Sequence, residues 1–123
     1  MTNPLSSEQL ASYERDGFLV LPNFVSPDAC DHLRRRAEDL VARFDPQGAV
    51  SVFSTREQTR TSDDYFLGSG DQVRFFFEED AFDGAGMLRQ SKDLSINKIG
   101  HALHDLDSVF DSFSRTAELA ELV

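Results

Sequence analysis

A lysine in an apolar stretch is the strongest chemical signal in this sequence. Lys98 is one of two lysines in the chain, and the segment around it, 95–107 (SINKIGHALHDLD), also holds two of the three histidines. If residues 94–99 form a strand, Leu94, Ile96 and Lys98 share one face, because side chains alternate across a strand. An ammonium among buried apolar side chains costs free energy unless an anion or another acceptor meets it. Lys98 is therefore a candidate ligand-binding residue, and the alternative is a lysine whose stem packs while its ammonium reaches water.

The two histidines of this segment have a spacing that would suit a metal on a helix. His101 and His104 are three residues apart, so one helix face could carry both imidazoles. No glutamate follows the first histidine as it does in a helical zinc protease, and no third ligand is evident. A packing or capping role is therefore favoured for the pair, with metal binding as the alternative.

Three further charged groups have both a functional and a structural interpretation. Residues 34–36 (RRR) are surrounded by acids, which favours a solvated, internally paired helix face over a basic patch. The acids at 63–64 and 78–80 lack the alternating spacing of a calcium loop and are expected to be solvated. Arg74 precedes three phenylalanines, so it could bind an anion, stack on a ring, or pair with an acid such as Asp71.

The composition predicts an acidic protein of one domain or part of one. The chain has 123 residues, 40% of them hydrophobic, with eleven phenylalanines and a formal net charge of −10. This charge argues against nucleic acid or anionic membranes as partners. The first residues predict no signal peptide, and no apolar run approaches the roughly 18 residues of a membrane span, so we expect a soluble cytoplasmic protein. The single cysteine, Cys30, excludes an intramolecular disulfide and is expected to be a small core residue.

Two helices with clear start signals are predicted in the first third of the chain. Ser6 and Gln9 form a capping box for a helix over residues 7–15, which stops at Asp16-Gly17. Residues 18–21 (FLVL) are predicted to form a short buried strand. Ser26 caps a second helix, whose apolar residues recur at helical spacing and which ends at Pro46 and Gly48. The apolar face of that helix comprises Cys30, Leu33, Ala37, Leu40, Val41 and Phe44.

Short strands and one more helix are predicted in the remainder. Segments 65–67 and 73–77 resemble the two arms of a hairpin around a turn at 68–71, and Asp107 can cap a last helix. The other predicted parts are a brief strand at 50–53, loops at 54–64 and 78–86, and the strand at 94–99. The last helix carries Val109, Phe110 and Phe113, and an apolar pattern continues from Ala117 to Val123 without a stop signal, as in a chain that has been cut.

Four segments carry a resemblance to a known family, in the order in which that family has them. They are 16–21 (DGFLVL), 64–67 (DYFL), 69–78 (SGDQVRFFFE) and 95–104 (SINKIGHALH). The first is a loose pattern, whereas the last two together are quite specific. With these segments the chain resembles the N-terminal part of the phytanoyl-CoA dioxygenase family, particularly its phytanoyl-CoA dioxygenase domain-containing branch.

This resemblance implies an Fe(II)- and 2-oxoglutarate-dependent oxygenase on a double-stranded β-helix, a jelly-roll barrel. The implied fold class is α+β, with residues 1–123 as the N-terminal part of a single domain: N-terminal helices plus the first strands of an incomplete barrel. In the family a His-x-Asp pair and a distal His hold iron, and a lysine matching Lys98 contacts 2-oxoglutarate. His32, His101 and His104 are not in a His-x-Asp pattern, so none is carried over as an iron ligand.

The resulting hypothesis is an N-terminal fragment of such a dioxygenase that is inactive by itself. Fe(II), 2-oxoglutarate and a small-molecule substrate would bind the complete enzyme, and no cofactor is expected to bind this chain stably on its own. Neither nucleic acid nor a membrane is an expected partner, and exposed strand edges predict some association. The alternative is a non-catalytic acidic protein-binding module.

Overall fold

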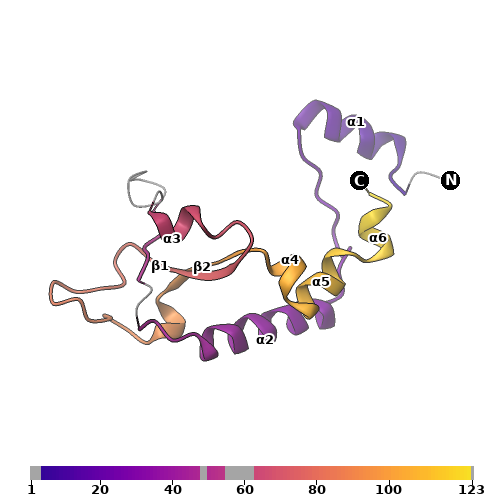
Figure 1. Cartoon of the computed structure of the whole chain (residues 1–123). Helices are drawn as coiled ribbons and strands as arrows, with labels where there is room; N and C mark the ends of the chain where they lie inside the picture. Colours follow the sequence, from indigo (N-terminus) through magenta and orange to yellow (C-terminus); the bar gives the residue numbers. More distant parts are fainter. Residues whose placement is uncertain (1–3, 48–49, 55–62, 123) are drawn as a thin grey trace.

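The computed structural model describes residues 4–47, 50–54 and 63–122 and has an α+β architecture. A two-stranded antiparallel sheet lies near one end of a long helix, and short helices lie along the other half of that helix (Figure 1). No helix in this described part is long and apolar enough to cross a membrane. In chain order the elements are α1 (Ser7–Asp16), α2 (Pro27–Arg43), α3 (Asp64–Leu67), β1 (Val73–Phe77), η2 (Lys92–Leu94), β2 (Ile96–His101), α4 (Leu103–Leu106), α5 (Ser108–Ser114) and α6 (Ala117–Ala120).

The two predicted N-terminal helices are confirmed, with their caps. Ser6 Oγ accepts from the Gln9 N–H at 3.2 Å and Gln9 Oε1 accepts from the Ser6 N–H at 2.8 Å, which is the predicted capping box. Gly17 ends α1 with φ of 77°, a conformation in which glycine has no steric cost. Ser26 Oγ likewise accepts from the Ala29 N–H at 3.2 Å and starts α2. These caps depend on residues within one turn, so local sequence predicts them.

The expected burial of Cys30 is wrong. Its side chain is exposed, whereas Leu33, Ala37 and Leu40 on the predicted apolar face are half-buried. A hollow between α2 and α5 is lined by Ala29 and Leu33 but not by Cys30. Helical periodicity therefore identified the apolar side of α2 correctly. Which residues at the beginning of α2 are covered depends on the position of α5.

The sheet pairs β1 with β2 and places the phenylalanine run at the centre of the core. Phe76 lies opposite Lys98 in the register, and a shift interrupts the pairing between Phe76 and Phe77. Phe76 and Phe77 are fully buried. The predicted strand at 50–53 is reduced to a parallel bridge between Val52 and Phe77, with the Phe53 N–H donating to the Phe77 carbonyl at 2.9 Å.

The two faces of the sheet are covered by different helices. On one face the Tyr65 and Phe66 rings of α3 meet the Phe76 ring edge-on, each at 5.5 Å between centroids. On the other face Phe44, which follows α2, stacks on Phe75 at 4.3 Å. Because β1 alternates its side chains, one phenylalanine run supplies the contacts of both layers.

Three strand predictions need correction. Residues 18–21 are not a strand, and Phe18 and Val20 are 65% and 70% exposed, because no strand in the described part of the chain pairs with them. Segment 65–67 is helical rather than an arm of a hairpin, since Asp63 Oδ1 accepts from the Phe66 N–H at 2.7 Å and caps α3. Of the loop predicted at 54–64, residues 55–62 lie outside the described residues, and the loop at 78–86 is confirmed.

The strand predicted at 94–99 is displaced toward the C-terminus. It runs over Ile96–His101, and Leu94 belongs to η2 with its side chain 61% exposed, so Leu94 does not share the face of Lys98. The buried Ser95 explains the shift, because its hydroxyl donates to the Ser91 carbonyl at 2.9 Å and closes the turn before β2.

The predicted Asp107 cap is confirmed and has a second function in the fold. Asp107 Oδ1 accepts from the Val109 and Phe110 N–H groups and starts α5, while Oδ2 accepts from Arg36 Nε and Nη2, both at 2.7 Å. Burial by itself would raise the pKa of Asp107, but the hydrogen bonds from Arg36 and the two backbone N–H groups outweigh it and leave the pKa below its ordinary value. Arg36 also pairs with Asp39 on α2 at 2.6 Å. The paired helix face predicted for 34–36 therefore holds for Arg34, which pairs with Asp31, and for Arg36, which also joins α2 to α5.

Replacing Lys92 by methionine should destabilise the junction of α2 and η2. Lys92 Nζ donates to the Ala42 and Phe44 carbonyls at 3.0 and 2.5 Å, so it satisfies oxygens at the end of α2. Methionine keeps much of the stem but donates no hydrogen bond, and the expected loss is about 1–3 kcal/mol in the free energy of unfolding. Urea denaturation measures it. Arg34→Met is the matched control, because the pair that Arg34 forms with Asp31 is exposed and its loss should cost about 0.5 kcal/mol or less.

Candidate functional site

Lys98 lies over a group of aromatic rings on the α3 side of the sheet. Its ammonium nitrogen is 4.8 Å from the centroid of the Phe53 ring, 5.3 Å from Phe66 and 5.9 Å from Phe76. We call these three rings the aromatic platform. Each distance is within the range at which a cation is attracted to the face of a ring.

Separate segments of the chain assemble this platform. Phe53 comes from the segment that bridges to the outer edge of β1, Phe66 from α3, and Phe76 from the strand opposite Lys98. The Phe53 and Phe66 rings also contact each other, with centroids 6.2 Å apart. Sequence reasoning identified Lys98 but missed Phe53 and Phe66 as its neighbours, because no spacing rule connects residues that meet only through the tertiary fold.

The ammonium of Lys98 has no acid partner in the described part of the chain. No carboxylate or carbonyl oxygen there lies within hydrogen-bonding or ion-pairing distance of Nζ, and ring faces are its close neighbours. A cation over a ring contributes about 0.5–2 kcal/mol, whereas hydrogen bonds between ionised groups are among the strongest in proteins. The half-buried Lys98 is therefore suited to receive an anion, and a carboxylate is the simplest one that fits.

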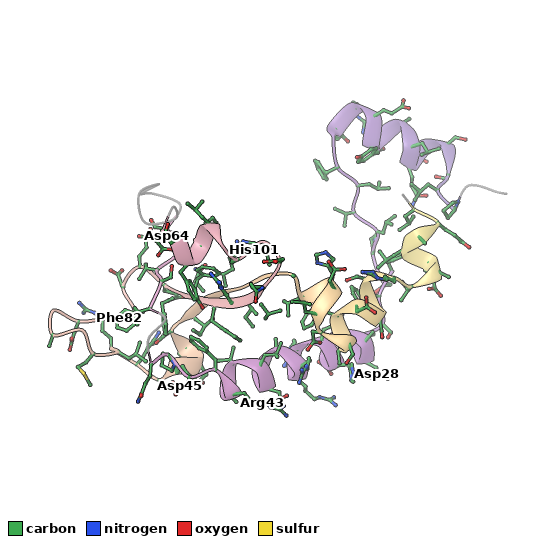
Figure 2. All side chains as sticks on the ribbon, viewed as in Figure 1. Asp28, Arg43, Asp45, Asp64, Phe82 and His101 are labelled. Carbon is green, nitrogen blue, oxygen red and sulfur yellow. The ribbon has the colours of Figure 1, made fainter. Side chains whose placement is uncertain are left out.

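His101 packs beside the same rings and is held by a buried serine. Ser69 Oγ donates to the Phe66 carbonyl at 2.5 Å, so it accepts from His101 Nδ1–H at 2.7 Å. The His101 ring meets Phe66 edge-on at 5.3 Å and lies 5.9 Å from Phe76. Figure 2 shows His101 on the side of the sheet that α3 covers. The packing role predicted for His101 is confirmed.

His101 and His104, for which metal binding was the alternative to packing, do not share a helix face. His101 ends β2, whereas His104 lies in α4 with an exposed side chain 3.3 Å from Asp105. The acids at 63–64 and 78–80 do not form a cation site either, because no group of three or more metal-binding side chains meets among the described residues.

Arg74 stacks rather than pairing with Asp71. Its guanidinium lies 4.7 Å from the centroid of the Tyr65 ring, and Nη1 donates to the Tyr65 carbonyl at 2.5 Å. Arg74 therefore fixes α3 on the sheet, and Lys98 remains the candidate cation of the site.

Comparison with known proteins identifies the family. The family model described as "Phytanoyl-CoA dioxygenase (PhyH)" matches residues 13–122. The chain belongs to this family. The phytanoyl-CoA dioxygenase domain-containing protein 1 homolog of Dictyostelium discoideum is 43% identical over 119 residues, which are 97% of this chain and 42% of that protein. A phytanoyl-CoA dioxygenase of Arabidopsis thaliana is 42% identical over 122 residues, 99% of this chain and 43% of its own length. Phytanoyl-CoA dioxygenase domain-containing protein 1 of Bos taurus is 48% identical over 111 residues, 86% of this chain and 38% of that protein.

The chain thus spans about two fifths of the length of the curated relatives it matches. Enzymes of the phytanoyl-CoA dioxygenase family in general depend on Fe(II) and 2-oxoglutarate. A carboxylate of 2-oxoglutarate fits the ammonium of Lys98, because the two groups carry opposite charges and no acid among the described residues pairs with this lysine. Iron does not fit the described residues, since they bring no three suitable ligands together.

Proposed function

We propose that this chain is the N-terminal part of an Fe(II)- and 2-oxoglutarate-dependent dioxygenase of the phytanoyl-CoA dioxygenase family, and that Lys98 binds a carboxylate of 2-oxoglutarate. The observation that supports this assignment is the placement of Lys98 on the aromatic platform without an acid partner among the described residues. An acid partner there would neutralise the ammonium and compete with the ligand. The platform keeps the cation in place without such competition.

The contribution of this chain to the reaction is to bind and orient the cosubstrate. 2-Oxoglutarate is a dianion, and one carboxylate would accept hydrogen bonds from Lys98 Nζ while the rings of Phe53 and Phe66 restrict water beside the ammonium. Iron and 2-oxoglutarate, when bound, supply the activation of O₂ for hydroxylation, with oxidative decarboxylation to succinate and CO₂. We place the iron ligands in a part of the enzyme outside this chain, and the chain alone is proposed to be inactive.

The proposal extends to the reaction class and not to an acyl-CoA substrate. The partner is a small molecule, chosen by residues outside this chain. The net charge of −10 supports neither nucleic acid nor an anionic membrane as a partner, and we propose a cytoplasmic location.

A fused protein tests this function directly. Residues 1–123 are joined to the remaining part of the Arabidopsis thaliana relative, in place of the segment that they match. We expect this fused protein to convert 2-oxoglutarate to succinate when Fe(II) is present, and we expect the separate chain to show no conversion. Succinate formation is measured with and without Fe(II).

Two results would contradict the proposal. Iron-dependent turnover by the separate chain would show that it is not merely a part of the enzyme. A fused protein that is folded and binds iron but leaves 2-oxoglutarate unchanged would favour the alternative of a non-catalytic acidic binding module. The unmodified relative is the positive control for the assay.

A further inference from the structure

The stem of Lys98 lies across a position that has no side chain. Gly100 is buried in β2, two residues after Lys98 and on the same face of the strand. A Cβ atom placed on Gly100 would be 3.1 Å from Lys98 Cε and 3.9 Å from Lys98 Cγ. The first distance is shorter than an ordinary contact between carbon atoms, about 3.5–4.0 Å. The space that a side chain would fill at Gly100 is therefore already occupied by the lysine.

A positive φ does not account for glycine at this position. Gly17 and Gly86 have φ values of 77° and 78°, in the region that favours glycine, whereas Gly100 is an extended strand residue without positive φ. Apart from chain neighbours, the described atoms within 4 Å of the added Cβ all belong to Lys98. Outside its chain neighbours, a side chain at Gly100 would therefore meet the lysine stem.

A side chain at Gly100 would displace the end of the lysine stem by a few tenths of an ångström. The crowded atom is Cε, the carbon that carries Nζ, so relieving the contact moves the charged end of Lys98 itself. Nζ is now 4.8 and 5.3 Å from the Phe53 and Phe66 rings, near the outer part of the range for cation–ring attraction, so a further displacement weakens that attraction.

We propose that Gly100 is a positioning residue for Lys98: its missing side chain leaves the space in which the lysine stem lies, and this directs the ammonium to the aromatic platform. The consequence for 2-oxoglutarate binding rests on the proposed function, in which Lys98 binds a carboxylate of 2-oxoglutarate. The placement of Lys98 itself does not depend on any ligand and can be tested without one.

The test compares Gly100→Ala with Gly70→Ala by NMR of the chain labelled at its lysine Cε positions. Because Lys92 and Lys98 are the two lysines, Lys92 of η2, whose ammonium binds carbonyls at the end of α2, serves as a reference within the same sample. Gly70 is the matched control, since an added Cβ there meets no atom within 4 Å and its φ is not positive. We expect the ring-shifted Lys98 signal to move toward that of free lysine in Gly100→Ala alone, with Lys92 unchanged in both variants. An unmoved Lys98 signal in a folded Gly100→Ala chain would overturn the proposal.

A double-mutant cycle covers the case in which Gly100→Ala is destabilised. If the clash with Lys98 is the cause, the cost of alanine at position 100 should largely disappear in a Lys98→Ala background, because the crowded atom is then absent. A cost that stays the same in both backgrounds would overturn the proposal and assign Gly100 a general packing role.

The effect of Gly100→Ala on the use of 2-oxoglutarate is measured in the fused protein. Gly100→Ala should raise the KM for 2-oxoglutarate by about threefold, since a misplacement of about 1 Å can cost about 100-fold and this contact requires a shift of a few tenths of an ångström. The value of kcat should change less, and Gly70→Ala should leave both parameters unchanged. If Lys98 moves in the NMR experiment while KM stays constant, the 2-oxoglutarate role of Lys98 fails and the positioning by Gly100 stands. If Lys98 does not move, the positioning fails whatever happens to KM.

Discussion

Lys98→Ala should raise the 2-oxoglutarate concentration needed for half-maximal turnover by tenfold or more. Removing one partner of a buried, hydrogen-bonded charge pair costs on the order of 2–5 kcal/mol, and about 1.4 kcal/mol corresponds to a factor of ten. The effect is expected to be this large because no second cation in the described residues approaches the platform. The measurement is the KM for 2-oxoglutarate in the fused protein.

Lys92→Ala is the matched control for this experiment. Lys92 is the other lysine of the chain, and its ammonium is bound to carbonyl oxygens at the end of α2, away from the platform. The KM of that variant should equal the parent value once both proteins are shown to be folded. An equal KM in Lys98→Ala and the parent would assign Lys98 to the alternative stated at the outset, a lysine that packs by its stem.

Asp107→Ala should cause the largest loss of stability among single substitutions in the helical part of the fold. The substitution removes a helix cap, typically worth about 1 kcal/mol, and also hydrogen bonds to a charged partner, worth about 1.5–3 kcal/mol. It also leaves Arg36, which is 28% exposed, without its contact to a carboxylate that is only 5% exposed. We expect the free energy of unfolding to fall by at least about 2 kcal/mol, as measured by urea denaturation.

Asp39→Ala separates this tertiary effect from the loss of a surface pair. Asp39 also pairs with Arg36, at 2.6 Å, but its side chain is 39% exposed and it caps no helix. Its replacement should change stability by about 1 kcal/mol or less. Equal losses for the two variants would contradict the assignment of Asp107 as the residue that joins α2 to α5.

The lowered pKa of Asp107 predicts how the stability of the protein depends on pH. Because the hydrogen bonds from Arg36 and the backbone hold the pKa of Asp107 below its ordinary value of 3.8, the folded state binds this proton less readily than the unfolded state. The contribution of Asp107 to stability is therefore fully present above about pH 4 and is lost as the pH falls through the lowered pKa. In Asp107→Ala this component should be missing, so the difference in stability between parent and variant should shrink on acidification.

Both the family and the candidate lysine could be predicted from the sequence. The segments at 69–78 and 95–104 carry the resemblance that the family model confirms over residues 13–122. Lys98 was marked by its apolar neighbours alone. The capping signals at Ser6, Ser26 and Asp107 also predicted helix starts correctly, because a cap and its helix are neighbours in the chain.

The strands were predicted less well, for a physical reason. A strand requires a partner to bind its backbone, and 18–21 has none among the described residues, while 65–67 belongs to α3, the helix that Asp63 caps. A short apolar run has no period long enough to distinguish helix from strand, so the outcome depends on which backbone lies beside it.

The sequence by itself determined the acidic character, the helix starts, the strand at 73–77 and the unusual lysine. Only the tertiary structure decided what surrounds that lysine. Phe53, Phe66 and Phe76 converge on Lys98, and Gly100 leaves room for its stem. Side chains far apart in the chain meet through packing of the whole fold, and no local spacing rule encodes such a meeting.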